Sequence, residues 1–382
     1  MRRNLMLAQA LLETQARSVL MITGAREVGT LPLPPGVDCL ALPGLGKSLS
    51  GSYRPRSLGI SLEELIRLRA DTILAAVQSF GPDVLIVDKK PLGVERELEP
   101  TVEWLHARGT ARLVLGLRDV LDAADAVERE WEAEDSEAVI RDRYDAVWVY
   151  GDPNVYDPVA EYGFSPEIAA KVRYSGYLDG RAVQPPAAST PGRDPLANLG
   201  LPPGRLALCV VGGGEDGFRI ADAFARAELP AGMNGVILTG PFMPAERCEL
   251  LRLRAVGRDL RVLRFVDDAG PLLDLADRVV AMGGYNTVCE LLSRRKRALI
   301  VPRTDPRREQ LIRAERTRDL GLLEMLHPDE LRPAALGEWL ARDAAPPERM
   351  LDRIDLDGLR RVPELLAEVV GAGRRAEVVN DG

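Results

Sequence analysis

The chain has 382 residues, of which 46% are hydrophobic and 28% charged, as in ordinary globular proteins. At about 150 residues per domain, this length predicts two or three domains. The 58 acidic residues outnumber the 50 Lys and Arg residues, and the net charge of −8 argues against a nucleic-acid binder or a polybasic membrane anchor. No apolar run approaches the roughly 20 residues that cross a bilayer, so no integral membrane segment is expected. Four dispersed cysteines and two histidines argue against a disulfide framework or a zinc site, and a reducing cytoplasm is the expected setting.

The first 180 residues alternate between apolar strand-like runs and amphipathic helical patterns. A helical pattern over residues 4–12 opens the chain, without the strand that usually feeds the first helix of an α/β domain. Short strands that are apolar on both faces, separated by helices, predict a parallel sheet covered by helices. Strands are expected at 18–23, 37–42, 83–87, 112–117, 146–150 and 172–175, and further helices at 62–80, 97–108 and 122–143.

Residues 181–204 break this alternation with a stretch rich in proline and glycine, which predicts a surface linker. A second domain is expected over residues 205–370, and a mobile tail over 371–382. Its strands are expected at 206–211, 235–239, 261–265, 278–282 and 298–301, and a last helix at 359–370. The predicted fold class is therefore α/β, with two doubly wound, Rossmann-like parallel-sheet domains facing a cleft. In such sheets ligands bind outside the carboxyl ends of the strands.

The first glycine turn, residues 212–217, has the sequence Gly-Gly-Gly-Glu-Asp-Gly and lies between a strand and a helix. Glycines let the backbone approach a phosphate, and the helix N-terminus supplies amide donors. A dinucleotide site would need an acidic residue at the end of the next strand, but that strand ends in Leu238, Thr239 and Gly240. NAD or FAD is therefore disfavoured, and a tight turn without a ligand stays an alternative.

The second glycine turn, residues 283–287, reads Gly-Gly-Tyr-Asn-Thr and also joins a strand to a helix. Asn286 or Thr287 could cap this helix or donate to an anion. Glu290, one turn further on, could complete a capping box or accept two hydroxyl protons of a ribose. Capping alone would explain these residues, but two phosphate-competent turns in one domain favour a nucleotide diphosphate.

The loop and helix after the strand at 298–301 carry several polar groups suited to a nucleotide sugar. Arg303 and Arg307 could neutralise phosphate, and Glu309 and Gln310 are good partners for hydroxyl groups. Charged runs at helix starts are also common on solvated surfaces, which is the alternative explanation of this segment.

Taken together, the two turns and this helix resemble the nucleotide-sugar half of GT-B glycosyltransferases. The nearest resemblance is to enzymes related to the N-acetylglucosaminyltransferase of peptidoglycan synthesis, in a less characterised bacterial branch of predicted glycosyltransferases. Segments 86–93, 116–119, 150–153 and 173–177 resemble this branch, so that the similarity extends over nearly the whole chain. It is fairly specific for the superfamily but not for the sugar or the acceptor.

The resemblance implies a hexosyltransferase-type enzyme that moves a sugar from a nucleoside diphosphate to an unidentified acceptor, and inversion at the anomeric carbon is the expected stereochemical outcome. A UDP-sugar is the expected donor, and neither a metal nor another cofactor is expected, because helix N-termini and basic side chains stabilise the leaving diphosphate. The diphosphate would contact the two turns, Glu290 the ribose, Phe265 and Val266 the base, Arg303 the phosphates, and Glu309 and Gln310 the sugar. The donor residues implied in the turns are Gly212, Gly213, Gly214, Gly283, Gly284, Tyr285, Asn286 and Thr287.

Acceptors in this family bind the N-terminal domain, where Asp88, Arg118 and Asp119 follow expected strands. One of these residues could act on the acceptor, although an Arg118–Asp119 ion pair would explain the second pair structurally. The related enzymes carry a glycine loop with a histidine before the first helix, and neither His106 nor His327 occupies that position. We therefore expect the general base in a strand and loop encoded upstream of Met1, by a longer reading frame.

Two other functions stay open at this point. A nucleotide-sugar epimerase of the same fold would share the donor chemistry and need no acceptor pocket. A noncatalytic nucleotide-sugar binder is the third hypothesis, because the histidine expected before the first helix is absent.

Overall fold

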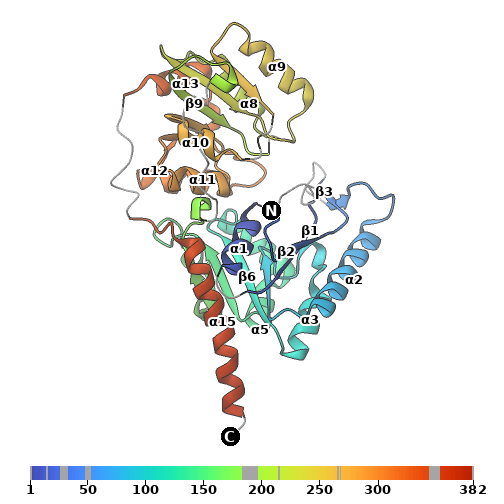
Figure 1. Ribbon diagram of the computed structural model, residues 1–382. Helices are drawn as coiled ribbons and strands as arrows, with labels where there is room; N and C mark the ends of the chain where they lie inside the picture. Colours follow the sequence, from blue (N-terminus) through green and yellow to red (C-terminus); the bar gives the residue numbers. More distant parts are fainter. Residues whose placement is uncertain are drawn as a thin grey trace. The chain divides into compact units, whose positions relative to one another are not determined.

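The computed structural model describes residues 2–13, 16–25, 33–47, 53–182, 197–213, 216–264, 266, 268–343 and 353–380. Two compact units make up the chain (Figure 1). The first unit contains residues 1–153, 157–178 and 357–382, and the second contains residues 154–156 and 179–356. None of the described helices is long and apolar enough to cross a membrane.

The second unit is built on a six-stranded parallel sheet whose described strands run in the order β11-β10-β9-β12-β13-β14. These strands are β9 (Arg205–Val210), β10 (Met233–Leu238), β11 (Leu260–Leu263), β12 (Arg278–Ala281), β13 (Ala298–Ile300) and β14 (Glu324–Met325). The connecting helices are α8 (Phe218–Arg226), α9 (Ala245–Ala255), α10 (Gly270–Leu275), α11 (Tyr285–Ser293), α12 (Glu309–Asp319) and α13 (Pro333–Ala341). The short 3₁₀ turns are η3 (Gly180–Ala182), η4 (Ala197–Leu199) and η5 (Pro328–Glu330).

The order of these strands reverses between β9 and β12. From β9 the chain adds β10 and β11 on one side, then crosses back to place β12 on the other side of β9. This reversal is the topological switch point at which doubly wound sheets bind ligands, beyond the carboxyl ends of the strands. The expected doubly wound parallel sheet is confirmed for this unit.

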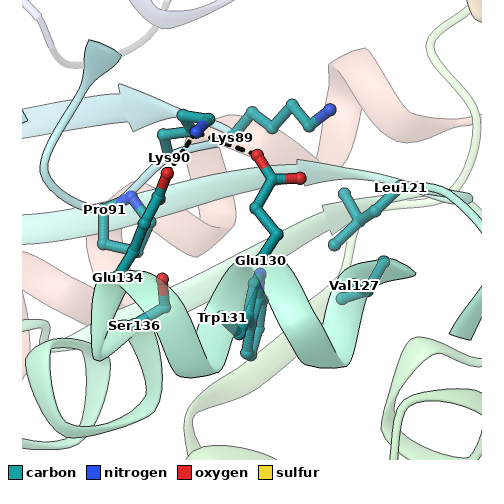
Figure 2. A pocket seen from close by; sticks show the side chains of 9 residues that line it. All are labelled: Lys89, Lys90, Pro91, Leu121, Val127, Glu130, Trp131, Glu134 and Ser136. Atoms are coloured by element: carbon teal, nitrogen blue, oxygen red, sulfur yellow. Dashed lines mark hydrogen bonds and ion pairs between the residues drawn. The ribbon is translucent and has the colours of Figure 1, made fainter. Parts of the chain in front are cut away.

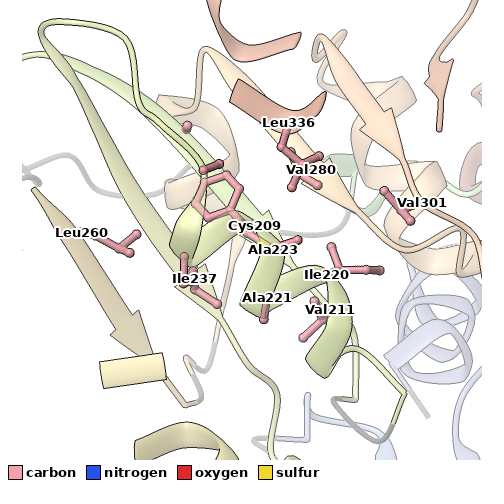
Figure 3. Packing of buried hydrophobic residues seen from close by; sticks show 14 of the residues in the cluster. Cys209, Val211, Ile220, Ala221, Ala223, Ile237, Leu260, Val280, Val301 and Leu336 are labelled. Atoms are coloured by element: carbon pink, nitrogen blue, oxygen red, sulfur yellow. The ribbon is translucent and has the colours of Figure 1, made fainter. Parts of the chain in front are cut away.

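Burial explains why these short sequences form strands. All six residues of β10 are buried, because helices cover both faces of the sheet. Phe224, Ile237, Val280 and Trp339 lie in one continuous apolar cluster, and Figure 3 shows part of it. A Cβ on Gly235 would come within 2.5 Å of Leu260, so the glycine in β10 allows close packing there.

The first unit carries four parallel strands in the order β5-β6-β7-β8, and a separate parallel pair, β1 and β2. These strands are β1 (Val19–Thr23), β2 (Val37–Ala41), β5 (Val84–Asp88), β6 (Arg112–Arg118), β7 (Ala146–Tyr150) and β8 (Val172–Tyr174), and an antiparallel hairpin joins β3 (Leu45–Lys47) to β4 (Tyr53–Pro55). The helices are α1 (Arg2–Leu12), α2 (Leu62–Phe80), α3 (Glu99–Arg108), α4 (Ala124–Glu134), α5 (Ser136–Arg143), α6 (Pro158–Glu161), α7 (Pro166–Lys171) and α15 (Gly358–Asn380), with the 3₁₀ turn η2 (Val94–Arg96).

The two units differ at the centre of their sheets. A doubly wound unit has the strand order 3-2-1-4-5-6. Its second to sixth strands correspond, in chain order, to β1, β2, β5, β6 and β7. The first strand of such a unit lies between the positions of β1 and β5. Ile22 of β1 and Leu85 of β5 pack against the same apolar cluster, yet both are only partly buried. Within the described residues, β1 and β5 are therefore both edge strands of their sheets, whereas β9 joins β10 to β12 in the second unit.

Three expectations from the sequence need correction. The single helix expected over 122–143 is two helices, because Asp135 adopts a left-handed conformation with φ 52° and ends α4. The stretch 357–370, assigned to the second domain, belongs to the first unit, where the N–H of Gly358 donates to Tyr177 and α15 packs on α1. The tail expected to be mobile from residue 371 continues α15 to Asn380. Most of the expected linker, residues 183–196, lies outside the described residues.

Candidate functional site

The two glycine turns emerge side by side at the switch point of the second unit. Val210, the last residue of β9, lies opposite Ala281, the last residue of β12. The N–H of Met282 then donates to the carbonyl oxygen of Val210 at 3.3 Å. Because neighbouring parallel strands end at the same edge of a sheet, the residues after them share one location. The structure therefore brings together the two turns that the sequence places about 70 residues apart.

Close backbone packing holds the first glycine turn against the loop after β10. Gly212 has a φ of 61° and Gly240 a φ of 77°, both in the left-handed region that favours glycine. A Cβ on Gly240 would lie 2.2 Å from the carbonyl oxygen of Gly212, which excludes any larger residue. The N–H of Phe242 donates to the carbonyl oxygen of Gly213 at 2.9 Å, and the Phe242 side chain is 51% exposed. The predicted site residue Gly214 lies outside the described residues.

The second glycine turn leads into the uncapped N-terminus of α11. The helix begins at Tyr285, and no side chain caps it at Gly284. Asn286 and Thr287 lie inside its first turn, so the expectation that one of them caps the helix is wrong. The capping box considered for Glu290 is excluded for the same reason, since the residue three positions before it is not an N-cap. First-turn amides without a side-chain cap are suited to bind an anion.

The second glycine turn also packs tightly on the start of α12. A Cβ on Gly283 would lie 2.9 Å from the backbone oxygen of Gln310, so this turn and this helix are in direct contact. Arg313, which is 1% exposed, donates from Nη1 to the carbonyl oxygen of Gly283 at 2.8 Å. Its guanidinium also lies 5.7 Å from the centre of the Tyr285 ring, within the range of a cation–π contact. The buried arginine thus holds the turn at Gly283 and at Tyr285.

Arg303 connects the first glycine turn with the start of α12. Its Nη1 donates to Oδ2 of Asp216 at 3.0 Å and its Nη2 to Oε1 of Glu309 at 2.6 Å. Its backbone N–H donates to Oε1 of Gln310 at 3.2 Å. Partial burial acts to lower the pKa of Arg303, but Glu309 and Asp216 outweigh it and raise that pKa, so the guanidinium stays charged. Three predicted donor residues therefore meet in one hydrogen-bonded group.

The remaining predicted donor residues lie near this group or outside the description. Glu290 is partly buried on α11, four residues beyond Asn286 and hence on the same helix face. Val266 follows β11 and is partly buried, whereas Phe265 lies outside the described residues. Their proposed contacts with ribose and base stay predictions.

The first unit gives different environments to the acceptor-side candidates. Asp119 is fully buried, and its carboxylate accepts hydrogen bonds from the N–H of Val120 at 2.7 Å and the hydroxyl of Tyr177 at 3.1 Å. Asp88 keeps 38% of its side chain exposed and forms an ion pair with Arg3 of α1. Arg118, at the end of β6, is partly buried. Burial makes Asp119 a structural residue, which leaves Asp88 as the accessible carboxylate of this group.

A small pocket beside Asp88 contains a paired lysine. Figure 2 shows the Lys90 ammonium between two carboxylates of α4, Glu130 at 2.9 Å and Glu134 at 2.5 Å. Burial acts to lower the pKa of Lys90, but these two carboxylates outweigh it and raise that pKa. Trp131 and Leu121 supply the apolar part of the lining, and Lys89 has a φ of 72°. Lys90 therefore fixes α4 to the segment after β5.

Sequence reasoning missed two residues of the site in the second unit. Asp216 was treated only as part of the glycine turn, although it pairs with Arg303 from 87 positions away. Arg313 looked like one of many charges on α12, and no local pattern marks it as buried. Among the described residues, no group of three or more His, Cys, Asp or Glu side chains is arranged to hold a metal ion.

Comparison with known proteins agrees with this geometry. The family model described as the glycosyltransferase family 28 C-terminal domain matches residues 208–361, which include both glycine turns and α12. Over 172 residues the chain is 30% identical to the UDP-N-acetylglucosamine–N-acetylmuramyl-(pentapeptide) pyrophosphoryl-undecaprenol N-acetylglucosamine transferase of Streptococcus sanguinis. The aligned residues cover 43% of this chain and 46% of that protein. The chain thus spans less than half the length of the curated relatives it matches.

Solved structures resemble the chain over nearly its whole length. The glycotransferase of kitacinnamycin aligns with 98% of this chain and 94% of its own, with a TM-score of 0.58 and 17% identity. MurG of Acinetobacter baumannii aligns with 97% and 95%, with a TM-score of 0.54 and 14% identity. The UDP-GlcNAc 2-epimerase of Neisseria meningitidis, bound to UDP-GlcNAc, aligns with 97% of both chains, with a TM-score of 0.59 and 12% identity.

These parallel-sheet units and their structural neighbours define a protein of the GT-B fold. Residues 208–361 are similar to the glycosyltransferase family 28 C-terminal domain, and part of the chain is similar to the N-acetylglucosaminyltransferase of peptidoglycan synthesis. The resemblance inferred from the sequence is confirmed at this level.

Proposed function

We propose that this protein is a glycosyltransferase that moves a sugar from a nucleoside diphosphate sugar to an acceptor in the cytoplasm. The observation that carries the proposal is the position of the two glycine turns, at one switch point and inside the segment that matches glycosyltransferase family 28. A UDP-sugar is our preferred donor, because the S. sanguinis relative is named for UDP-N-acetylglucosamine. The same name supports our proposal that the transferred sugar is a hexose derivative.

The proposed chemistry uses the residues of the second unit to stabilise a leaving diphosphate. The first-turn amides of α11 and the backbone of the first glycine turn bind the diphosphate oxygens, where negative charge grows as the bond to the sugar breaks. Glu290 accepts hydrogen bonds from the ribose, Val266 and Phe265 contact the base, and Glu309 and Gln310 contact the sugar. No metal takes part in this proposal, because the amide groups of the two turns stabilise the charge of the leaving diphosphate.

The acceptor enters from the first unit in this proposal. Its hydroxyl oxygen bonds to the anomeric carbon, the bond from that carbon to the diphosphate oxygen breaks, and a base takes the hydroxyl proton. Attack opposite the leaving group inverts the configuration. Asp88 is the candidate base within the described residues, because its carboxylate is accessible.

A nucleotide-sugar epimerase is the second candidate function. The similarity in fold to the N. meningitidis epimerase supports it, although at 12% identity this similarity concerns the fold alone. An epimerase would change UDP-N-acetylglucosamine without any acceptor, so incubation of the protein with this sugar nucleotide alone tests this candidate. Appearance of an epimer would favour it over glycosyl transfer.

Binding measurements with UDP and UDP-N-acetylglucosamine test the proposed donor site. Glu290→Ala should weaken binding of both by about 1–3 kcal/mol, the usual cost of removing a hydrogen-bond partner from a buried polar group. Gln310→Ala should reduce discrimination among UDP-sugars and leave UDP binding nearly unchanged. The matched control is Glu249→Ala on α9, whose side chain is 64% exposed. If neither nucleotide binds the wild-type protein, the proposal is wrong; if Glu290→Ala binds like the control, Glu290 has no ribose role.

A further inference from the structure

The contacts of Arg303 fix which hydrogen-bonding atoms remain for a ligand. The backbone N–H of Arg303 can only donate, so the Gln310 atom that faces it is the carbonyl oxygen Oε1. With that oxygen engaged, the side-chain amide of Gln310 has its two N–H groups left to donate. Gln310 therefore recognises an acceptor atom of a ligand.

Glu309 complements Gln310, because it can accept a hydrogen bond from a ligand where Gln310 donates one. Its Oε1 is held by Arg303, and the side chain is only 15% exposed. Its Oε2 is buried and has no hydrogen-bond partner among the described residues. An ionised carboxylate can only accept, and a buried oxygen without a donor costs free energy. Glu309 is thus suited to receive a hydroxyl hydrogen from a ligand.

Asp216 places a negative charge inside the turn that is proposed to receive the diphosphate. A carboxylate there would repel an incoming diphosphate unless a cation compensated it. Arg303 provides that cation at 3.0 Å, with 25% of its own side chain and 50% of the Asp216 side chain exposed. One arginine thus neutralises Asp216 and orients Glu309 at the same time.

We propose that Arg303 is a positioning residue for the donor, which couples the diphosphate turn to the sugar-contacting start of α12. This inference rests on the proposed function and extends it. Arg303 acts on the diphosphate by neutralising Asp216 and on the sugar by holding Glu309. The donor sugar must then present a hydroxyl to Glu309 Oε2 and an oxygen acceptor to Gln310, so a sugar deoxygenated at that hydroxyl is a poor donor.

The test compares dissociation constants of UDP and UDP-N-acetylglucosamine by calorimetry for a set of variants. Arg303→Met should weaken the binding of UDP about tenfold, because Asp216 then repels the diphosphate. It should weaken the binding of UDP-N-acetylglucosamine by about a further tenfold, because Glu309 is no longer held. Arg303→Met combined with Asp216→Asn should recover UDP binding but not the additional loss for the sugar nucleotide. Arg318→Met is the matched control, since Arg318 lies in the last turn of α12, away from Glu309 and Gln310, and pairs with its neighbour Asp319.

Two further variants keep the test informative if Arg303→Met folds poorly. Asp216→Asn alone removes one of the two carboxylates that pair with Arg303 and so lowers the negative charge beside the diphosphate turn, which should tighten UDP binding about threefold or more. Arg303→Lys keeps the positive charge but replaces the two-armed guanidinium with one ammonium. Compared with Arg303→Met, it should recover the affinity for UDP but only part of the preference for UDP-N-acetylglucosamine over UDP.

Three results would overturn the inference. An equal loss of UDP and UDP-N-acetylglucosamine in Arg303→Met, without recovery in the double variant, would assign Arg303 a direct contact with phosphate. If Asp216→Asn binds UDP as tightly as the wild type, Arg303 does not act by neutralising Asp216. Absence of binding of either nucleotide to the wild-type protein would reject the proposed function itself, and the inference with it.

Discussion

Ala281 lies directly opposite Val210 where β12 and β9 end together. From these two residues the chain enters the two glycine turns, and from there the helices α11 and α8. A doubly wound sheet makes this juxtaposition only at its switch point. Nearly all of the proposed donor chemistry depends on this pair of strand ends, so the predictions below concentrate on the residues that follow them.

Gly283→Ala should destabilise the protein, whereas Gly284→Ala should be tolerated. A Cβ at residue 283 meets the backbone oxygen of Gln310 at 2.9 Å, and backbone atoms cannot move away as a flexible side chain can. We expect a loss of about 1–3 kcal/mol in the free energy of unfolding, as for overpacked sites. At residue 284 a Cβ meets nothing within 4 Å, so the loss should stay below about 1 kcal/mol. Urea unfolding of both variants gives the comparison, and equal losses would contradict the packing described.

Gly284→Ser should stabilise the protein but weaken its binding of UDP. A serine at the N-cap can accept a hydrogen bond from the first-turn amides of α11, which no side chain now caps. Such a cap contributes about 0.5–2 kcal/mol to stability relative to alanine at the same position, and about a few tenths of a kcal/mol relative to glycine. The same amides are those proposed to bind diphosphate, so the hydroxyl and the ligand would compete.

Thermal unfolding and UDP titration of Gly284→Ser test this competition, with Gly284→Ala as the control that adds no hydroxyl. A stabilised Gly284→Ser protein that binds UDP as tightly as wild type would show that these amides do not contact the ligand.

Lys90→Met should destabilise the first unit in a pH-dependent way. Removal of the ammonium leaves Glu130 and Glu134 facing each other, which should cost about 1–3 kcal/mol near neutral pH. Because the folded state raises the pKa of Lys90 above its ordinary 10.5, the contribution of Lys90 is complete below pH 10.5. It is then lost as the pH rises through the raised value.

The difference in unfolding free energy between wild type and Lys90→Met should therefore shrink above pH 10.5. Urea unfolding at several pH values measures it. Arg129→Met is the control on the same helix, because its pair with Asp125 is about 70% exposed and such surface pairs contribute little. A constant difference across this pH range would argue against the ion pair as its cause.

Local patterns were sufficient to predict β9 to β13 of the second unit and the glycine turns that follow β9 and β12, whereas the short strand β14 was not predicted. Apolar runs of the right length followed by glycine, as at Val210 and Met282, specify a buried strand and its end regardless of what surrounds them. Contacts between distant segments were not predictable in this way. Asp216 and Arg303 are 87 positions apart, and neither sequence neighbourhood indicates the other.

The unpredicted break at Asp135 and the wrong assignment of α15 to the second domain both result from tertiary contacts. The break at Asp135 requires a left-handed residue inside an otherwise continuous helical pattern, and tertiary packing rather than local propensity selects it. The return of α15 to the first unit depends on contacts such as Arg361 with the carbonyl oxygen of Ser175, 186 residues earlier. Periodicity identifies the helix at 359–370 but carries no information about which unit it covers.

The strand β5 of the first unit is less buried than its counterpart in the second unit. Val84, Leu85 and Ile86 of β5 are only partly buried, whereas three of the four residues of β12, the corresponding strand of the second unit, are buried. We expect backbone amides of β1 and β5 to exchange with solvent faster than those of β9. Equal exchange rates in β5 and β9 would contradict this difference in burial.

The most direct test of the donor site is the effect of UDP on amide hydrogen exchange in both glycine turns, compared with that of uridine. If the turns bind one pyrophosphate, UDP slows exchange in residues 212–217 and in 283–287 together, with a single binding constant, while uridine at the same saturation leaves both unchanged. Protection of only one turn, or equal protection by uridine, would contradict a shared diphosphate site.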